Sequence, residues 1–371
     1  MTQTPDIDDV IAQISAIRQS HLENRMARHF NETAFRALAP DGRARLLDIF
    51  ASGIANPDSQ MGAYAQQPDD YDVFQEFLEP MIRDHHGIDA RADIRQVNDW
   101  GDGSQSHDLS DIDPALGDLS ARVRVARNAA DFPLPGAMDQ DDRVAFEERM
   151  IEAFSTLITN PNYGGEYLSL TPGSPYELTP EAYQARVAAH QMFKDMSGDP
   201  YLDAAGISND WPYGRGMYVS ADEQFLIWVG EEDHLRVMAM QRGGTLGSLF
   251  DRLQSGLAAI EALGPRFAHS SRYGFITSCP TNLGAGMRAS AHLPLPKLTK
   301  RGSDLSAAKA LAKQHGLAVR GVGGEHTEAG SDGRIDISPG ARLMVTEGEI
   351  RRRLYDGIAA LWAAEKQAPS A

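Results

Sequence analysis

The sequence has very little cysteine, since Cys279 is the only one among 371 residues, and this excludes an internal disulfide. No stretch approaches the roughly 18 consecutive apolar residues that indicate a membrane-spanning helix. Basic residues are also in the minority, with 35 Lys and Arg against 52 Asp and Glu and a net charge of -17. These absences argue against nucleic acid or an anionic membrane as the main partner. Residues 1–9 lack the pattern of a secretory or organelle-targeting segment, so we expect a cytoplasmic protein.

Motifs for familiar nucleotide and metal chemistry are missing as well. The chain has no Gly-x-x-x-x-Gly-Lys-Ser/Thr loop and no His-Arg-Asp catalytic loop, which excludes, as far as motifs can, a P-loop enzyme and a typical protein kinase. The histidines are scattered without the short spacings of a zinc site, as at His190, His234, His292 and His326. We therefore expect no metal ion held by protein ligands.

The length of the chain predicts about two domains. Residues 1–97 have a helical pattern, with apolar residues recurring at helical spacing, as at Ile11, Ile14 and Ile17. Residues 98–119 are polar and glycine-containing, which predicts a linker. Residues 120–371 mix strand-like and helical segments, so this range is the predicted second domain.

The second domain contains eight short strand-like runs with few β-α-β repeats, at 121–125, 216–219, 225–229, 235–240, 273–278, 288–293, 317–320 and 334–337. Five longer segments have helical periodicity, at 141–158, 180–195, 245–263, 303–315 and 346–366. The sequence therefore predicts an α+β protein. It has a small all-helical N-terminal domain and a larger domain with an eight-stranded antiparallel sheet flanked by helices.

Arginines are prominent among the strand-like runs. Arg122 and Arg124 alternate with Val123 and Val125, so the valines can be buried while both guanidinium groups project from the other face. Adjacent like charges are unfavourable unless an anion lies between them. For this run alone, a solvated sheet face and a phosphate site both remain open.

Three more arginines lie in or beside strand-like runs, namely Arg236, Arg288 and Arg320. Five such arginines could clamp a triphosphate, because guanidinium groups bind phosphate oxygens through planar, bidentate hydrogen bonds. Whether the five converge depends on the fold.

Two carboxylates and one thiol are further candidates. Glu232 lies in an acidic turn, and in so acidic a chain the pattern alone favours an ordinary exposed turn. Glu325 follows a glycine-rich run after Arg320, and those glycines would allow close approach of the backbone to a ligand. Cys279 is either a small buried hydrophobe or a thiolate activated by positive neighbours.

Several of these segments resemble the phosphagen (guanidino) kinases, the family that contains the arginine and creatine kinases. Residues 279–292 (CPTNLGAGMRASAH) look like the family signature around its reactive cysteine. Four further blocks match in the right order, at 58–74 (DSQMGAYAQQPDDYDVF), 120–128 (SARVRVARN), 231–236 (EEDHLR) and 320–327 (RGVGGEHT). The resemblance covers about residues 5–365 and implies reversible phosphoryl transfer from ATP to a guanidino compound.

The resemblance also implies roles for individual residues. The nucleotide site would comprise Ser120, Arg122, Arg124, His190, Arg236, Arg288, Ala289, Ser290, His292, Arg320, Gly321, Val322, Gly323 and Gly324. The guanidino site would comprise Glu232, Cys279 and Glu325, together with a specificity loop of Ser59, Gln60, Met61, Gly62, Ala63 and Tyr64. The catalytic residues would be Glu232, Glu325, Cys279, Arg236, Arg288 and Arg320. ATP or ADP would bind with Mg²⁺, which phosphate and water oxygens would hold.

Two features favour L-arginine as the acceptor. The specificity loop is short and position 325 is Glu, as in arginine kinases, whereas creatine kinases have a longer loop and an apolar residue at that position. Gln60 and Met61 replace smaller residues, so taurocyamine and creatine remain alternatives. A protein-arginine kinase would lack the helical domain and its loop, and a scaffold without activity would have lost catalytic groups. We expect a monomer or homodimer.

Overall fold

Six helices form the N-terminal part of the computed structural model, which describes residues 6–103, 105–321, 330 and 332–369. They are α1 (Ile7–Ser20), α2 (Arg25–His29), α3 (Glu32–Ala37), α4 (Pro40–Ala55), α5 (Asp70–Val73) and α6 (Gln75–His86). The side chains of Asp6, Asn24 and Asn31 precede the first three helices and accept hydrogen bonds from their first-turn N–H groups. α4 begins with a proline, which needs no N–H partner at that position.

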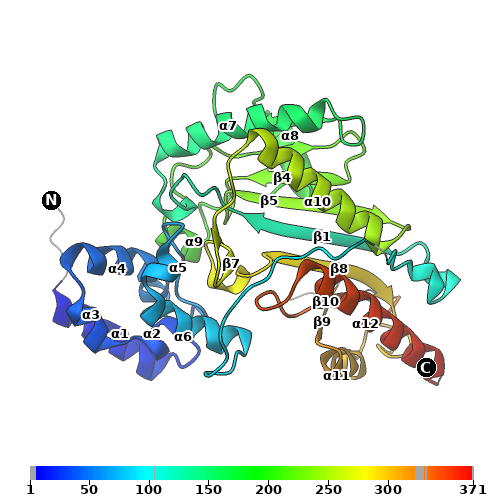
Figure 1. Ribbon diagram of the computed structural model, residues 1–371, viewed down its shortest axis with the longest axis horizontal. Coiled ribbons are helices and arrows are strands. Elements are labelled where there is room, and N and C mark those ends of the chain that lie inside the picture. The colour runs from blue at the N-terminus through cyan, green and yellow to red at the C-terminus, as the bar shows by residue number, and fades with distance from the viewer. Residues whose placement is uncertain (1–5, 104, 322–329, 331, 370–371) are drawn as a thin grey trace.

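The helical domain is held together by the apolar faces of these helices, which bury residues such as Ile14, Phe50 and Leu78. The same core includes Tyr273 and Cys279, which come from far along the chain. In Figure 1 the helical domain lies beside the end of the sheet nearest β7. The predicted helical domain is confirmed, and its core continues into a segment of the larger domain.

Eight strands form one antiparallel sheet in the order β2-β3-β4-β5-β1-β8-β10-β9. They are β1 (Ser120–Arg127), β2 (Glu166–Ser169), β3 (Gly216–Val219), β4 (Phe225–Val229), β5 (Leu235–Arg242), β8 (Met287–Pro294), β9 (Leu317–Gly321) and β10 (Arg334–Pro339). The hairpin-like neighbours β3-β4-β5 are sequential, whereas β1 inserts between β5 and β8. The predicted fold class is confirmed.

Helices cover one face of this sheet. On the other face, an apolar cluster that includes Met217, Leu226 and Met238 covers part of β3, β4 and β5, and the remaining part carries the site. The helices of this domain are α7 (Gln140–Ile158), α8 (Pro180–Ala188), α9 (Pro200–Ala204), α10 (Leu246–Leu263), α11 (Ser306–Gln314) and α12 (Glu347–Gln367). α7, α10 and α12 pack against the sheet side chains that include Val123 and Val125 (Figure 1). Thr346 and Glu349 form the capping box of α12, which the sequence predicts. None of the described helices is long and apolar enough to cross a membrane.

Two predicted element assignments are wrong. Residues 273–278 are not a strand of the main sheet, because Gly274 turns with a positive φ of 72° and only Gly274–Phe275 (β7) pairs, with His269–Ser270 (β6). β2, which the sequence analysis missed, occupies the edge instead. The helix predicted at 180–195 ends at Ala188, shortly before His190 adopts a positive φ of 58°. A non-glycine residue in that conformation cannot continue a right-handed helix.

The predicted linker, 98–119, is not detached from the larger domain. Leu109, Leu116 and Leu119 are buried in the core beneath the sheet. Two short 3-10 turns, Leu109–Asp111 and Pro114–Leu116, lead from the helical domain into β1. The domain limits at 97/98 and 119/120 stay predictions, but the second half of this segment packs as part of the sheet domain.

Candidate active site

The open face of the sheet carries a row of arginines. On β1, Arg122 and Arg124 point away from the buried valines. Arg124 lies directly opposite Arg288 on β8, and Asp336 on β10 lies opposite Arg320 on β9. Residues directly opposite each other in an antiparallel pair share a face. The strand register therefore gathers side chains that are up to about 200 positions apart in the sequence.

Arg236 on β5 joins the same face, because Met238, two residues later, lies opposite Arg124. Its guanidinium group is held by an ion pair with Glu231 at 2.8 Å and lies over the ring of Trp228, 5.3 Å from the centroid. Arg288 is held by Asp336, with 2.9 Å between Nη2 and Oδ2. These carboxylates and the indole fix the directions in which the arginines point.

A cavity of about 650 Å³ opens where this face meets the helical domain. It is lined by His85, His86, Arg124, Glu232, Arg236, Thr281, Asn282, Arg288, Arg320, Gly340, Ala341, Arg342 and Leu343. Four of the five predicted arginines and Glu232 thus share one cavity. The open question from the sequence is answered for Arg124, which lines a cavity rather than a solvated sheet face.

Positive charge is concentrated at one end of this cavity. Burial, followed by the charges of Arg236, Arg122 and Arg288, lowers the pKa of Arg124 well below its ordinary value. Burial, followed by the positive charge of Arg320, also lowers the pKa of Arg288. Such mutual repulsion is relieved when a polyanion binds among the guanidinium groups. The geometry therefore suits a chain of phosphate groups.

The other end of the cavity is acidic. Burial, followed by the charges of Asp233 and Glu231, raises the pKa of Glu232 well above the ordinary carboxyl value. Asn282 donates a hydrogen bond to Glu232 Oε1 at 3.0 Å, and Arg342 donates to Asn282 Oδ1 at 2.7 Å. The sequence pattern favoured an exposed acidic turn at Glu232, and this prediction is wrong. Glu232 is an oriented, partly buried carboxyl group beside the arginines.

Cys279 lies next to this acidic end and is 8% exposed. Its Sγ atom is 3.1 Å from Thr281 Oγ1. Burial, and then the negative charge of Glu232, raises the pKa of the thiol to about 12. In the ligand-free protein Cys279 is therefore a neutral thiol, and a thiolate needs a bound cation to balance it.

Asp233 ties the acidic turn to the cysteine segment. Its Oδ1 accepts hydrogen bonds from Asn128 Nδ2 at 2.7 Å and from the Ser278 N–H at 2.6 Å. Asn128 follows β1 directly. The end of β1, the acidic turn and the residue before Cys279 are therefore fixed to one another by a single buried carboxyl group.

None of the six residues of the predicted specificity loop is among the described residues that line the cavity. Met61 and Ala63 are buried in the helical core, so their side chains point away from it. Gly62 has a positive φ of 76°, and a Cβ atom there would lie 2.8 Å from Met26 Cβ. Ser59 and Gln60 lie at the loop surface. Burial, and then the charges of Cys279 and Glu232, raise the pKa of the Tyr64 hydroxyl, so this loop residue is close enough to both groups to interact electrostatically with them.

The other predicted residues differ in where the structure places them. Ser290 and His292 lie on the arginine face, where Ser290 is opposite Arg122. Ala289 points into the apolar core, so only its backbone could face a nucleotide. Ser120 and His190 are exposed and are not among the described residues that line the cavity. Gly321 ends β9, while Val322, Gly323, Gly324 and Glu325 lie outside the described residues.

Sequence reasoning missed several residues of the cavity wall. His85 and His86 end α6, and burial first of all lowers the pKa of each to about 4, so both are neutral near pH 7. Arg342 also contacts Thr281, donating to its carbonyl oxygen at 3.0 Å. The adjacent histidine pair at the end of an amphipathic helix was a visible signal. Arg342 carried none, because it follows β10 in an irregular segment.

Comparisons with known proteins agree with this geometry. Two family models match, namely the ATP:guanido phosphotransferase N-terminal domain over residues 20–83 and its C-terminal catalytic domain over residues 145–368. The arginine kinase of Limulus polyphemus is 37% identical over 327 residues, covering 88% of this chain and 87% of that protein. A probable arginine kinase of Caenorhabditis elegans is 34% identical over 374 residues, covering 99% of this chain and all of that protein.

Solved structures of relatives have the same fold. A duplicated taurocyamine kinase from Schistosoma mansoni, with bound transition state analogue components, matches with a TM-score of 0.81 and 30% identity over 96% of this chain. This chain spans about half (48%) of that duplicated protein. A lombricine kinase matches with a TM-score of 0.77 and 28% identity, covering 89% of this chain and 91% of that one. With its arginine-lined cavity and the match to both family models, the chain belongs to the ATP:guanido phosphotransferases, the phosphagen kinases.

Proposed function

We propose that this chain transfers the γ-phosphoryl group of ATP to L-arginine, reversibly, to give phosphoarginine and ADP. The observation that carries the proposal is one cavity that is lined both by arginines and by the carboxyl group of Glu232. The short loop at 59–64 and Glu325 favour arginine, and curated relatives at 34% and 37% identity are described as arginine kinases.

In the proposed reaction, the arginines neutralise and position the phosphates. Arg124, Arg236, Arg288 and Arg320 would hold the nucleotide so that the γ-phosphorus faces the acidic end. A loose phosphoryl-transfer transition state needs positioning and charge stabilisation more than covalent help from the protein. Mg²⁺ would neutralise further charge while held by phosphate and water oxygens.

At the acidic end, Glu232 would orient the guanidinium group and accept its proton. A nitrogen–phosphorus bond forms as the bond from phosphorus to the bridging oxygen of ADP breaks, and the nitrogen loses one proton. Because the arginine side chain has a pKa above about 12, that proton should leave late. The raised pKa of Glu232 suits a proton acceptor near neutral pH. Cys279 would become a thiolate beside the bound cation.

The test is ADP formation from ATP with a panel of acceptors, namely L-arginine, taurocyamine, lombricine and creatine. We expect the highest kcat/KM with L-arginine. Equal or faster turnover with taurocyamine would replace arginine by that substrate, an alternative that the match to a taurocyamine kinase structure makes specific. A protein-bound arginine, tested in a denatured protein substrate, should not be phosphorylated.

A further inference from the structure

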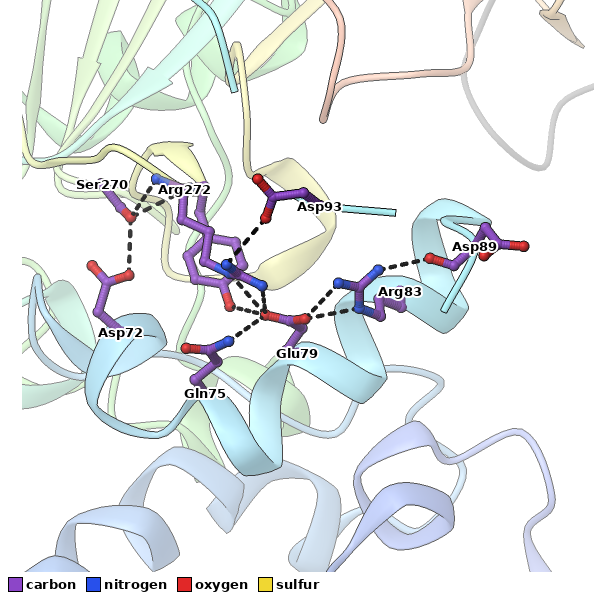
Figure 2. Close-up of polar contacts among 9 residues, drawn as sticks. Asp72, Gln75, Glu79, Arg83, Asp89, Asp93, Ser270 and Arg272 are labelled. Atoms are coloured by element: carbon purple, nitrogen blue, oxygen red, sulfur yellow. Dashed lines mark hydrogen bonds and ion pairs between the residues drawn. The ribbon is translucent and has the colours of Figure 1, made fainter. Parts of the chain in front are cut away.

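A buried carboxyl group lies between the helical domain and the segment that leads to Cys279. Glu79 is in α6 and is 9% exposed (Figure 2). From its own helix, Gln75 donates to Oε2 at 2.9 Å and Arg83 to Oε1 at 2.8 Å. From the sheet domain, Arg272 Nε and the Tyr273 hydroxyl donate to Oε2 at 2.8 and 2.9 Å. One carboxyl group thus binds side chains from both domains.

The residues around Glu79 favour its charged form. Burial raises the pKa of Glu79, but hydrogen bonds from Arg83, Tyr273 and Arg272 outweigh burial, and the net effect lowers it. Arg272 adds a second contact, with 2.7 Å between Nη2 and Oε2. On the other side of the same guanidinium group, Arg272 Nη1 is 3.6 Å from Oδ1 of Asp93, whose side chain is largely exposed. The shorter contacts of Arg272 are therefore with Glu79, and its contact with the exposed Asp93 is longer.

The two elements joined by Glu79 both run on into the cavity wall. α6 ends at His85 and His86, seven residues or fewer after Glu79. The segment from Arg272 reaches Cys279 within seven residues and then Thr281 and Asn282 of the same wall. A further contact joins α6 to this segment, from His86 to the Pro280 carbonyl oxygen. The preceding helix α5 adds hydrogen bonds from Ser270 to Asp72 and from the Tyr71 hydroxyl to the carbonyl oxygens of Thr277 and Ser278.

We propose that Glu79 is a positioning residue. It sets the distance between the cavity wall formed by His85 and His86 and the segment from Arg272 to Asn282, which contains Cys279. It thereby shapes the part of the cavity around Glu232, where the guanidino substrate would bind. Glu79 does not itself line that cavity. The proposal deepens the proposed function and rests on it where substrate affinity is concerned. The arginine strands lie outside this contact, so the nucleotide end should be independent of Glu79.

The first test measures kinetics of Glu79→Gln with the acceptor that the parent enzyme uses best. A glutamine keeps the size but turns one acceptor oxygen into an amide that faces the Arg272 donors. We expect the KM for the guanidino substrate to rise about tenfold, because small misplacements of substrate-positioning groups are costly. The Kd for MgADP should stay within about twofold, a split that simple destabilisation of the fold would not produce.

Matched variants separate docking from helix stability. Glu76→Gln makes the same change on an exposed residue of the same helix and should leave every parameter at the parent value. Arg83→Gln removes the partner within the helix, whereas Arg272→Gln and the milder Tyr273→Phe remove partners from the other domain. Only the latter two should raise the KM for the guanidino substrate. Combined with Glu79→Gln, Arg272→Gln should add little, since both break one contact.

The second test needs no turnover. Because Cys279 is the only cysteine, alkylation of the native protein by iodoacetamide reports on this segment alone. We expect Glu79→Gln and Arg272→Gln to speed alkylation at least about fivefold over the parent, and Glu76→Gln not to change it. Parental alkylation rates in Glu79→Gln would overturn the proposal, as would equal rises in the KM for both substrates. If the parent phosphorylates no guanidino compound, the proposed function fails, and the alkylation rates alone decide on Glu79.

Discussion

Arg124 on β1 lies directly opposite Arg288 on β8, so two guanidinium groups stand side by side on one face of the sheet. Like charges directly opposite each other destabilise an antiparallel pair. Burial first, and then the charges of neighbouring arginines, lower the pKa of both side chains. The arrangement costs stability in the free protein and is useful only when an anion binds.

Replacing Arg124 by alanine should therefore separate stability from function. We expect the melting temperature of Arg124→Ala without ligand to equal or exceed that of the parent, because repulsion and burial of a charge are removed. The stabilisation by MgADP should be lost and kcat/KM should fall about 100-fold or more. Thermal melts with and without MgADP measure both effects. Arg242→Ala, an exposed arginine at the far end of β5 paired with Asp118, is the control and should bind MgADP normally.

Arg320→Lys should damage the enzyme although the charge is kept. A lysine ammonium group offers a point charge and cannot form the bidentate pair that a guanidinium group forms with phosphate. We expect kcat/KM for ATP to fall at least about tenfold, as initial rates over a range of ATP concentrations would show. The same change at the exposed Arg301 should have no effect. Parental kinetics in Arg320→Lys would mean that Arg320 does not bind the nucleotide.

Guanidino binding should release protons. The pKa of Glu232 is raised in the free protein, and a bound guanidinium cation favours the carboxylate and so lowers that pKa again. Between the bound and the free pKa, affinity rises as pH rises, and above the free pKa it becomes constant. Calorimetry in two buffers of different ionisation enthalpy counts the protons released. Glu232→Gln should remove the Glu232 share of the release and leave the proton that Cys279 gives up, and a release equal to the parent's would assign the whole release to groups other than Glu232.

Cys279→Ala should lower kcat sharply while the protein stays folded. The thiol acts through the charge that it gains beside a bound cation, and alanine cannot carry that charge. Only a small buried group is lost, so the melting temperature should stay close to the parent's. Steady-state kinetics and a thermal melt of the same preparation measure kcat and the melting temperature of the variant. Full activity at every salt concentration would assign Cys279 to the helical core alone, where it is also packed.

Local sequence patterns were sufficient for most of the fold. Alternation in the run from Arg122 to Val125 predicts which side chains face the core, because successive residues of a strand point to opposite faces. The Thr346 and Glu349 capping box predicts where α12 begins. The run at 273–278 misled, because Tyr273 and Ile276 are buried in the helical core, and only Phe275 packs against the core of the sheet domain. Glu166–Ser169 was missed because a four-residue strand with polar ends carries little periodicity.

For the site as well, some properties follow from the sequence and others only from the tertiary structure. The sequence alone determined the kinds of group available, five arginines near strands, an acidic turn and one cysteine, and the order of motifs that identifies the family. Only the tertiary structure decided that Glu232 accepts a hydrogen bond from Asn282, that Cys279 is a neutral thiol, and that His85 joins the cavity wall. Burial and strand register bring together groups that are distant along the chain, and a side chain's pKa depends on those neighbours, so neither can be obtained from local sequence.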